Sequence, residues 1–179
     1  MEALYEKEGT LMKKNPFELA YKKYHRELYF YALSLCRHEE LAKDLVSETF
    51  YKAFLTLETP DNNIKFWLFR VLKNLFIDYQ RTSKYHFSLE DYEIILDNQN
   101  QDSPLKKIIK NERDHEIYKK ILSLTPNNYR EIIILYYYGG LSIKEIAVTL
   151  NSNPSTIKTT LHRARKKLKR LMKEDIYEF

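Results

Sequence analysis

Hydrophobic and polar residues alternate with the period of a helix along the first half of the chain. In the first periodic stretch, from position 15 to 35, the apolar residues recur at spacings of three and four: Phe17, Ala20, Tyr21, Tyr24, Leu28, Tyr31 and Leu35. Residues 40–57 and 65–81 repeat the pattern, with a polar loop containing Pro60 between them. This spacing brings apolar side chains to one face of a helix, so three amphipathic helices are expected.

Proline marks two helix starts in the second half. Ser103 before Pro104 indicates a helix over residues 104–124, since Ser is a good N-cap and Pro fits the first helical position. Thr125-Pro126 repeats the signal for a helix over 128–138, which two glycines end.

A capping box predicts the next helix. Ser142 and Glu145 have the required spacing, and the helix is expected to end at position 150. After a turn at 151–153, Asn153 caps a final helix over 154–173. Two helices joined by so short a turn have the spacing of a helix-turn-helix.

Residues 83–103 interrupt the helical pattern and end in a polar run. These 21 residues are long for a loop inside one compact domain, so we interpret them as a flexible linker. No segment shows a strand pattern. The sequence therefore predicts an all-α protein of two small helical domains: a tail at 1–13, a domain at 14–82, the linker, and a domain at 104–179 that contains the helix-turn-helix.

The last predicted helix is strongly basic. Its apolar stripe must face a core, while the opposite face carries hydroxyls and cations, namely Ser155, Thr159, Arg163, Lys166 and Arg170. Between Thr156 and Lys173 there are eight basic residues and no acidic one. Such a helix repels itself unless a polyanion neutralises it, which favours nucleic acid as its partner. A solvated basic surface is the alternative.

The net charge of +5 conceals a gradient that supports this interpretation. Residues 105–179 hold 16 basic and 8 acidic side chains, whereas residues 83–104 hold 1 and 5. The single cysteine, Cys36, excludes an internal disulfide and a cysteine-based zinc site. No stretch approaches the ~18 apolar residues of a membrane span. Glu2, Glu6 and Glu8 argue against a signal peptide, so a cytoplasmic location is expected.

Nothing in the sequence indicates an enzyme. The five histidines lack metal-ligand spacing, Cys36 has no base beside it, and no glycine-rich phosphate loop occurs. We therefore expect no catalytic residue, no metal and no cofactor.

Four motifs resemble the sigma-70 family. Residues 141–147, LSIKEIA, and 155–168, STIKTTLHRARKKL, resemble region four of bacterial sigma factors. Residues 41–54, LAKDLVSETFYKAF, and 66–79, FWLFRVLKNLFIDY, resemble region two. The two pairs lie in the expected order on either side of the linker. The chain is similar to a group-four, or extracytoplasmic-function (ECF), sigma factor, which keeps only these two regions.

The resemblance implies a sigma factor that binds core RNA polymerase and directs promoter-specific transcription initiation. Region four would read the −35 element, and region two would read and melt the −10 element. The implied partners are the β′ clamp helices of core polymerase, promoter DNA and an anti-sigma factor, without membrane insertion. The alternative is a two-domain helix-turn-helix regulator that does not depend on polymerase, although such a protein has no need of the 41–54 motif.

The resemblance also assigns residues to each surface. The −35 duplex would contact Arg130, Ser155, Thr156, Lys158, Thr159, Arg163 and Lys166. The −10 strand would contact Asn62, Asn63, Phe69, Arg70, Lys73, Asn74 and Asp78. Core polymerase would contact Asp44, Leu45 and Glu48.

Two segments depart from the family pattern, and one residue bears on core packing. The loop at 58–65 is short and lacks the aromatic and glycine pattern with which such factors bind a flipped −10 base. Residues 1–13 match nothing, so an alternative start at Met12 and a disordered tail both remain open. Trp67 is expected to be buried among the other aromatic residues of its helix.

Overall fold

The structure is a computed structural model that describes residues 15–57, 63–82 and 112–174. Every regular element in these ranges is helical, which confirms the all-α prediction. The N-terminal half consists of α1 (Pro16–Cys36), α2 (Glu39–Thr56) and α3 (Ile64–Thr82), each within one residue of the bounds expected from the periodicity. The tail predicted at 1–13 and the linker predicted at 83–103 lie outside the described residues.

The C-terminal half contains α6 (Glu112–Leu122), α7 (Asn127–Ile133), α8 (Ile143–Thr149) and α9 (Pro154–Glu174). Between α7 and α8 the chain forms a π-helical turn, η1 (Ile134–Tyr138), so the helix expected over 128–138 changes its hydrogen-bond spacing partway. The backbone N–H of Gly139 donates to Ile134 O, five residues back, at 2.9 Å. Of the helix expected over 104–124, the first eight residues lie outside the described ranges.

Capping side chains fix the helix-turn-helix as the sequence predicted. The Ser142 N–H donates to Glu145 Oε2 at 2.7 Å, and the Glu145 N–H donates to Ser142 Oγ at 3.3 Å, which completes the capping box. Asn153 Oδ1 accepts a hydrogen bond from the Thr156 N–H at 2.8 Å at the start of α9. These bonds satisfy backbone donors that a helix N-terminus otherwise leaves open.

The start of α7 differs from the prediction. Pro126, rather than Thr125, occupies the N-cap position, and no side chain caps this end. Thr125 instead accepts hydrogen bonds from Lys167 Nζ of α9, at 2.8 Å to its backbone oxygen and 3.0 Å to Oγ1. The Thr125 hydroxyl, which the sequence predicted to cap α7, therefore bonds to α9 instead.

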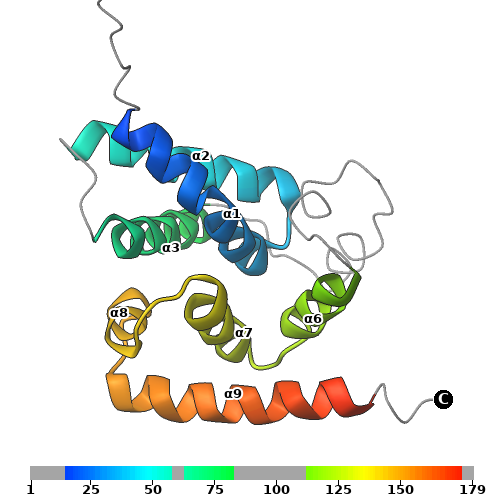
Figure 1. Ribbon diagram of the computed structural model, residues 1–179. Helices are drawn as coiled ribbons and strands as arrows, with labels where there is room; N and C mark the ends of the chain where they lie inside the picture. The colour runs from blue at the N-terminus through cyan, green and yellow to red at the C-terminus, as the bar shows by residue number, and fades with distance from the viewer. Residues whose placement is uncertain (1–14, 58–62, 83–111, 175–179) are drawn as a thin grey trace, which may run out of the picture.

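The helices form two layers that share one hydrophobic core. In Figure 1, α1, α2 and α3 lie above α6, α7 and α8, and α9 runs along the lower edge. α1 packs against α2 and α3 and also contacts α7 and η1. Seven consecutive residues of α1, from Leu28 to Ser34, are at most 1% exposed. Because successive residues point around the whole helix circumference, this segment is covered on every side.

Candidate nucleic-acid and protein interfaces

The outer face of α9 carries most of the residues assigned to duplex DNA. Ile157, Leu161 and Ala164 are buried and hold α9 against α7 and α8. The residues assigned to DNA on this helix are all exposed: Ser155, Thr156, Lys158, Thr159, Arg163 and Lys166. No carboxylate in the described part of the chain pairs with Lys158, Arg163 or Lys166. Their charge is thus available to a polyanion.

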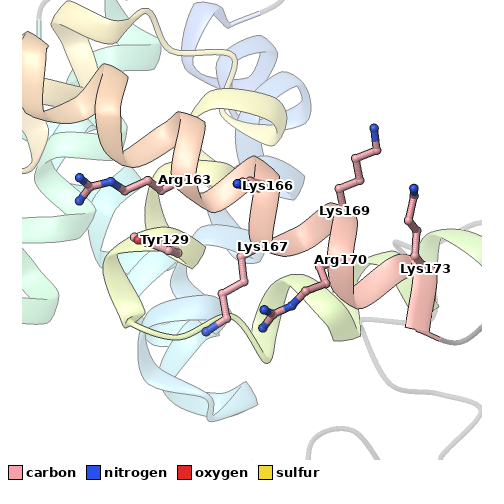
Figure 2. A pocket seen from close by; sticks show the side chains of 7 residues that line it. All are labelled: Tyr129, Arg163, Lys166, Lys167, Lys169, Arg170 and Lys173. Carbon is pink, nitrogen blue, oxygen red and sulfur yellow. The ribbon is translucent and has the colours of Figure 1, made fainter.

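A basic hollow of about 510 Å³ lies along α9. Figure 2 shows its lining, in which Tyr129 comes from α7 and the other six residues come from α9: Arg163, Lys166, Lys167, Lys169, Arg170 and Lys173. Cations around an aromatic ring suit a phosphate backbone, which supplies most of the affinity of DNA-binding proteins. The sequence indicated the cations, but the fold was needed to bring Tyr129 beside them.

Arg130 is not available for a DNA phosphate, which corrects the assignment made from the family resemblance. Its side chain is buried, with 5% exposure, and its guanidinium donates to the backbone oxygen of Leu122 at 3.2 Å. The bond ties the C-terminal end of α6 to α7. An unpaired carbonyl in this place would be costly, so Arg130 stabilises the domain instead.

Three of the residues assigned to the −10 strand form an exposed stripe on α3. Arg70, Asn74 and Asp78 are four residues apart and all exposed. Asp78 also forms a solvent-exposed ion pair with Arg81, with 3.6 Å between Oδ1 and Nη1. Asn63 is exposed just before α3, and Asn62 lies outside the described residues.

The remaining two residues of the −10 set do not lie on this stripe. Phe69 is 0% exposed and packs 5.5 Å from the Tyr31 ring, between centroids, so the assignment of Phe69 to single-strand stacking is wrong for this conformation. Lys73 forms an ion pair with Glu131 of α7 at 2.6 Å. Trp67, expected to be buried, is only partly buried, so part of its ring surface is accessible to a base.

The acidic pair assigned to core polymerase lies on the outer face of α2. Asp44 and Glu48 are both exposed and one turn apart. Leu45 is buried at 5% exposure in the core, so it cannot contact a partner there and its assignment to the interface is corrected. On the same side of α2, the structure adds Tyr51 and Leu55, which are 57% and 62% exposed. Tyr51 and Leu55 follow Glu48 by three and seven residues, which places them on the same face of the helix. This spacing can be seen in the sequence, but the family motif does not assign either residue to the interface.

The described residues contain neither a candidate metal site nor a membrane-spanning helix. No group of three or more His, Cys, Asp or Glu side chains in them could hold a metal ion. None of the described helices has the length and apolar character needed to cross a membrane.

Comparison with known proteins agrees with the two-part layout. The family model for sigma-70 region 2 matches residues 20–85, and the model for sigma-70 region 4 matches residues 115–168. The chain is 35% identical over 154 residues to the ECF RNA polymerase sigma factor SigM of Bacillus subtilis, covering 84% of this chain and 91% of that protein. It is also 31% identical over 162 residues to RNA polymerase sigma factor YlaC of the same organism, covering 89% and 93%.

A solved structure has the same architecture. The sigma factor RpoE of Bartonella quintana, in complex with the anti-sigma factor NepR, matches with a TM-score of 0.60 and 25% identity, covering 88% of this chain and 96% of that one. The chain belongs to the sigma-70 family. It is a sigma factor of the ECF type, which directs RNA polymerase to promoters, and sigma factors are non-enzymatic initiation factors.

Proposed function

We propose that the exposed face of α9 reads the −35 element in the major groove. Ser155, Thr156 and Thr159 are short enough to allow a close approach to base edges, and Lys158, Arg163 and Lys166 supply cations to guanine or phosphate. The observation that carries this proposal is the capped helix-turn-helix whose second helix exposes Lys158, Arg163 and Lys166 on one basic face. The basic hollow beside Tyr129 extends the same surface along the DNA backbone.

The exposed stripe of α3 is the proposed surface for the −10 strand. Arg70 supplies charge, while Asn74 and Asp78 supply hydrogen-bonding groups for base edges, with Asn63 and Asn62 at the start of the helix. Asp44 and Glu48 on α2 are the proposed contact with the β′ clamp helices of core polymerase. An acidic patch in a protein with a net charge of +5 suits a basic partner surface.

The proposed division of the chain follows these surfaces. Residues 14–82 form the region 2 domain, 83–103 the linker and 104–179 the region 4 domain, after a tail at 1–13. The matched ranges support this division. The related sigma factor solved with an anti-sigma factor supports an anti-sigma partner here. We propose that the chain has no catalytic activity of its own and works in the cytoplasm, where polymerase and promoter DNA are.

Run-off transcription with purified core polymerase tests the function directly. Core enzyme with this protein should initiate at a defined set of promoters, and core enzyme alone should not. A polymerase-independent regulator would instead bind duplex DNA without conferring promoter-specific initiation.

Reversing the acidic pair tests the polymerase contact. Asp44→Lys with Glu48→Lys should abolish capture of core polymerase, because two acidic contacts become like-charge repulsions. The fold should persist, since exposed substitutions usually shift stability by less than ~0.5 kcal/mol. The measurement is a pull-down with core enzyme, with circular dichroism as the folding control.

Glu18→Lys with Glu116→Lys is the matched control, because it changes the charge equally at exposed positions outside the patch. Capture should survive this change. A folded Asp44→Lys/Glu48→Lys protein with parental affinity for core polymerase would refute the proposed contact.

A further inference from the structure

Tyr129 and Arg130 are consecutive residues of α7, and their side chains point in different directions. Arg130 points into the fold, where its guanidinium donates to the backbone oxygen of Leu122 at 3.2 Å. A step of one residue turns a helix by about 100°, so Tyr129 faces α9 instead. Among the described residues that line the basic hollow, Tyr129 is the only aromatic residue and the only one from α7. The phosphate contact assigned to Arg130 therefore lies one residue away from the side chain that reaches this surface.

Packing holds the ring of Tyr129 in place, while its hydroxyl stays open to a ligand. The side chain is partly buried and packs against the hydrophobic core. Within the described part of the chain, Tyr31 Oη and Tyr118 Oη donate hydrogen bonds, but Tyr129 Oη makes none. Figure 2 shows the Tyr129 hydroxyl beside Arg163, whose guanidinium extends in the same direction. A phenol O–H is a donor, so among cations it is suited to an anionic oxygen.

Two hydrogen bonds from α9 hold the turn that precedes Tyr129. Lys167 Nζ donates to the backbone oxygen of Thr125 at 2.8 Å and to Thr125 Oγ1 at 3.0 Å. The Tyr129 N–H donates to the backbone oxygen of Pro126 at 2.9 Å, which ties Tyr129 to the same turn. The start of α7 is thereby fixed against α9. Two of the three donors of the Lys167 ammonium are used within the fold, so this cation of the hollow differs in role from Arg163.

The cations around Tyr129 indicate what its hydroxyl binds. Arg163 and Lys166 line the same hollow and are exposed, and no carboxylate in the described part of the chain pairs with either of them. A guanidinium, an ammonium and a phenol O–H together match the oxygens of a phosphate, which tyrosine hydroxyls as well as cations contact in DNA complexes. Because α9 is the helix proposed to enter the major groove, the phosphate belongs to a strand that borders this groove.

We propose that Tyr129 is a backbone contact of the −35 duplex, in which Oη donates a hydrogen bond to a phosphate that flanks the base pair read by Arg163. The contact between Lys167 and Thr125 positions the phenol for this bond. A phosphate contact carries no sequence information but fixes the orientation of the protein on the duplex. The proposal rests on the −35 function proposed for α9, and it gives Tyr129 the role that the family resemblance gave to Arg130.

Removal of a single oxygen atom tests the contact, because Tyr129→Phe keeps the ring and its packing. Core polymerase reconstituted with this variant should bind a labelled promoter duplex about three- to tenfold more weakly than with the parent, on all −35 sequences alike. A neutral donor releases no counterion, so the slope of log affinity against log salt should not change, whereas Lys166→Gln should reduce it by ~0.9. Tyr24→Phe, the same change at a partly buried tyrosine of α1, should bind as the parent does.

A double-mutant cycle tests the positioning role of Lys167, with circular dichroism as the folding control. Lys167→Met should weaken duplex binding in the parent and should have a smaller effect in Tyr129→Phe, because the hydroxyl that it positions is then absent. Equal effects in both backgrounds would refute this role. Parental affinity of Tyr129→Phe beside weakened binding of Arg163→Ala would refute the phosphate contact and leave the −35 function intact. Parental affinity of Arg163→Ala and Lys166→Gln as well would count against the −35 function itself.

Discussion

Two arginines of region 4, Arg130 and Arg163, have opposite environments and therefore opposite roles. Arg130 is buried and bonded to the backbone of α6, whereas Arg163 is exposed on α9 beside the basic hollow. Removing Arg130 leaves a buried carbonyl without its donor, which costs about 1–3 kcal/mol. Removing Arg163 takes away only exposed surface.

Arg130→Ala should therefore lower the free energy of unfolding by ~1–3 kcal/mol. Arg163→Ala should leave stability within ~0.5 kcal/mol of the parent. Urea denaturation followed by circular dichroism compares the two. An Arg130→Ala protein of parental stability with weakened DNA binding would reinstate Arg130 as a phosphate contact.

Buried thiol and phenol groups make the stability of the fold sensitive to alkaline pH. Burial raises the pKa of the Cys36 thiol to about 12, and it raises the pKa values of Tyr31 and Tyr118 well above their usual range. The folded state thus keeps protons that the unfolded chain loses above pH ~8.5 at the thiol and above pH ~10 at the two phenols. The stabilisation is complete below these values, and it falls by ~1.4 kcal/mol per pH unit for each group once the pH exceeds the pKa that the group has in the unfolded chain.

Urea denaturation midpoints should therefore stay level from pH 7 to 8.5 and decline steeply above pH ~9. Cys36→Ala should decline less steeply than the parent, since it removes one of these groups. Equal slopes for the two proteins between pH 9 and 12 would show that the Cys36 thiol does not contribute.

At the scale of single elements, the exposed cations of α9 divide into a proposed base contact, Arg163, and a proposed phosphate contact, Lys166. Arg163 and Lys166 both line the basic hollow, together with Lys169 and Lys173. A phosphate contact releases counterions without sequence preference, whereas a base contact affects one position of the site.

Lys166→Gln should weaken −35 duplex binding equally on all sequences and reduce the slope of log affinity against log salt by ~0.9. Arg163→Ala should cost ~1–3 kcal/mol of binding and relax specificity at one base pair. Fluorescence anisotropy over a salt series, with Lys22→Gln of α1 as the control, measures both effects. An unchanged salt slope in Lys166→Gln would exclude a phosphate contact.

The elements themselves could be predicted because their signals are local. Asn153 and the Ser142–Glu145 capping box act within three residues, and the apolar period of α1 to α3 spans a few turns. Burial could not be predicted in this way. Phe69 and Leu45 occur in motifs that the resemblance assigns to surfaces, yet neighbouring helices cover both side chains.

Contacts between segments that are far apart in the chain could not be predicted from the sequence either. Tyr31 Oη donates a hydrogen bond to Glu131 Oε1 across 100 residues of the chain, and each residue looks like an ordinary member of its own amphipathic helix. Only the fold brings them together. The same holds for Tyr129 and the cations of α9, since a period of three and four residues determines which face a residue occupies but not which helix meets that face.

At the scale of the whole molecule, the two halves share a core and should unfold together. Trp67, the single tryptophan, reports on α3, while far-ultraviolet circular dichroism reports on all helices. The two signals should give coincident urea transitions in the parent, as expected for two-state unfolding. Glu131→Lys should separate them, because each half then unfolds with its own stability. Coincident transitions in the folded variant would indicate that the aromatic contacts alone couple the halves.

The complete burial of α1 from Leu28 to Ser34 bears on how the free protein stays dispersed in solution. Phe30 and Tyr31 are covered by the C-terminal half, so separation of the halves would turn them toward water. Exposed aromatic patches promote self-association. A molecule whose halves were separated would therefore be prone to aggregate, and the contact between the halves keeps these aromatic side chains away from water.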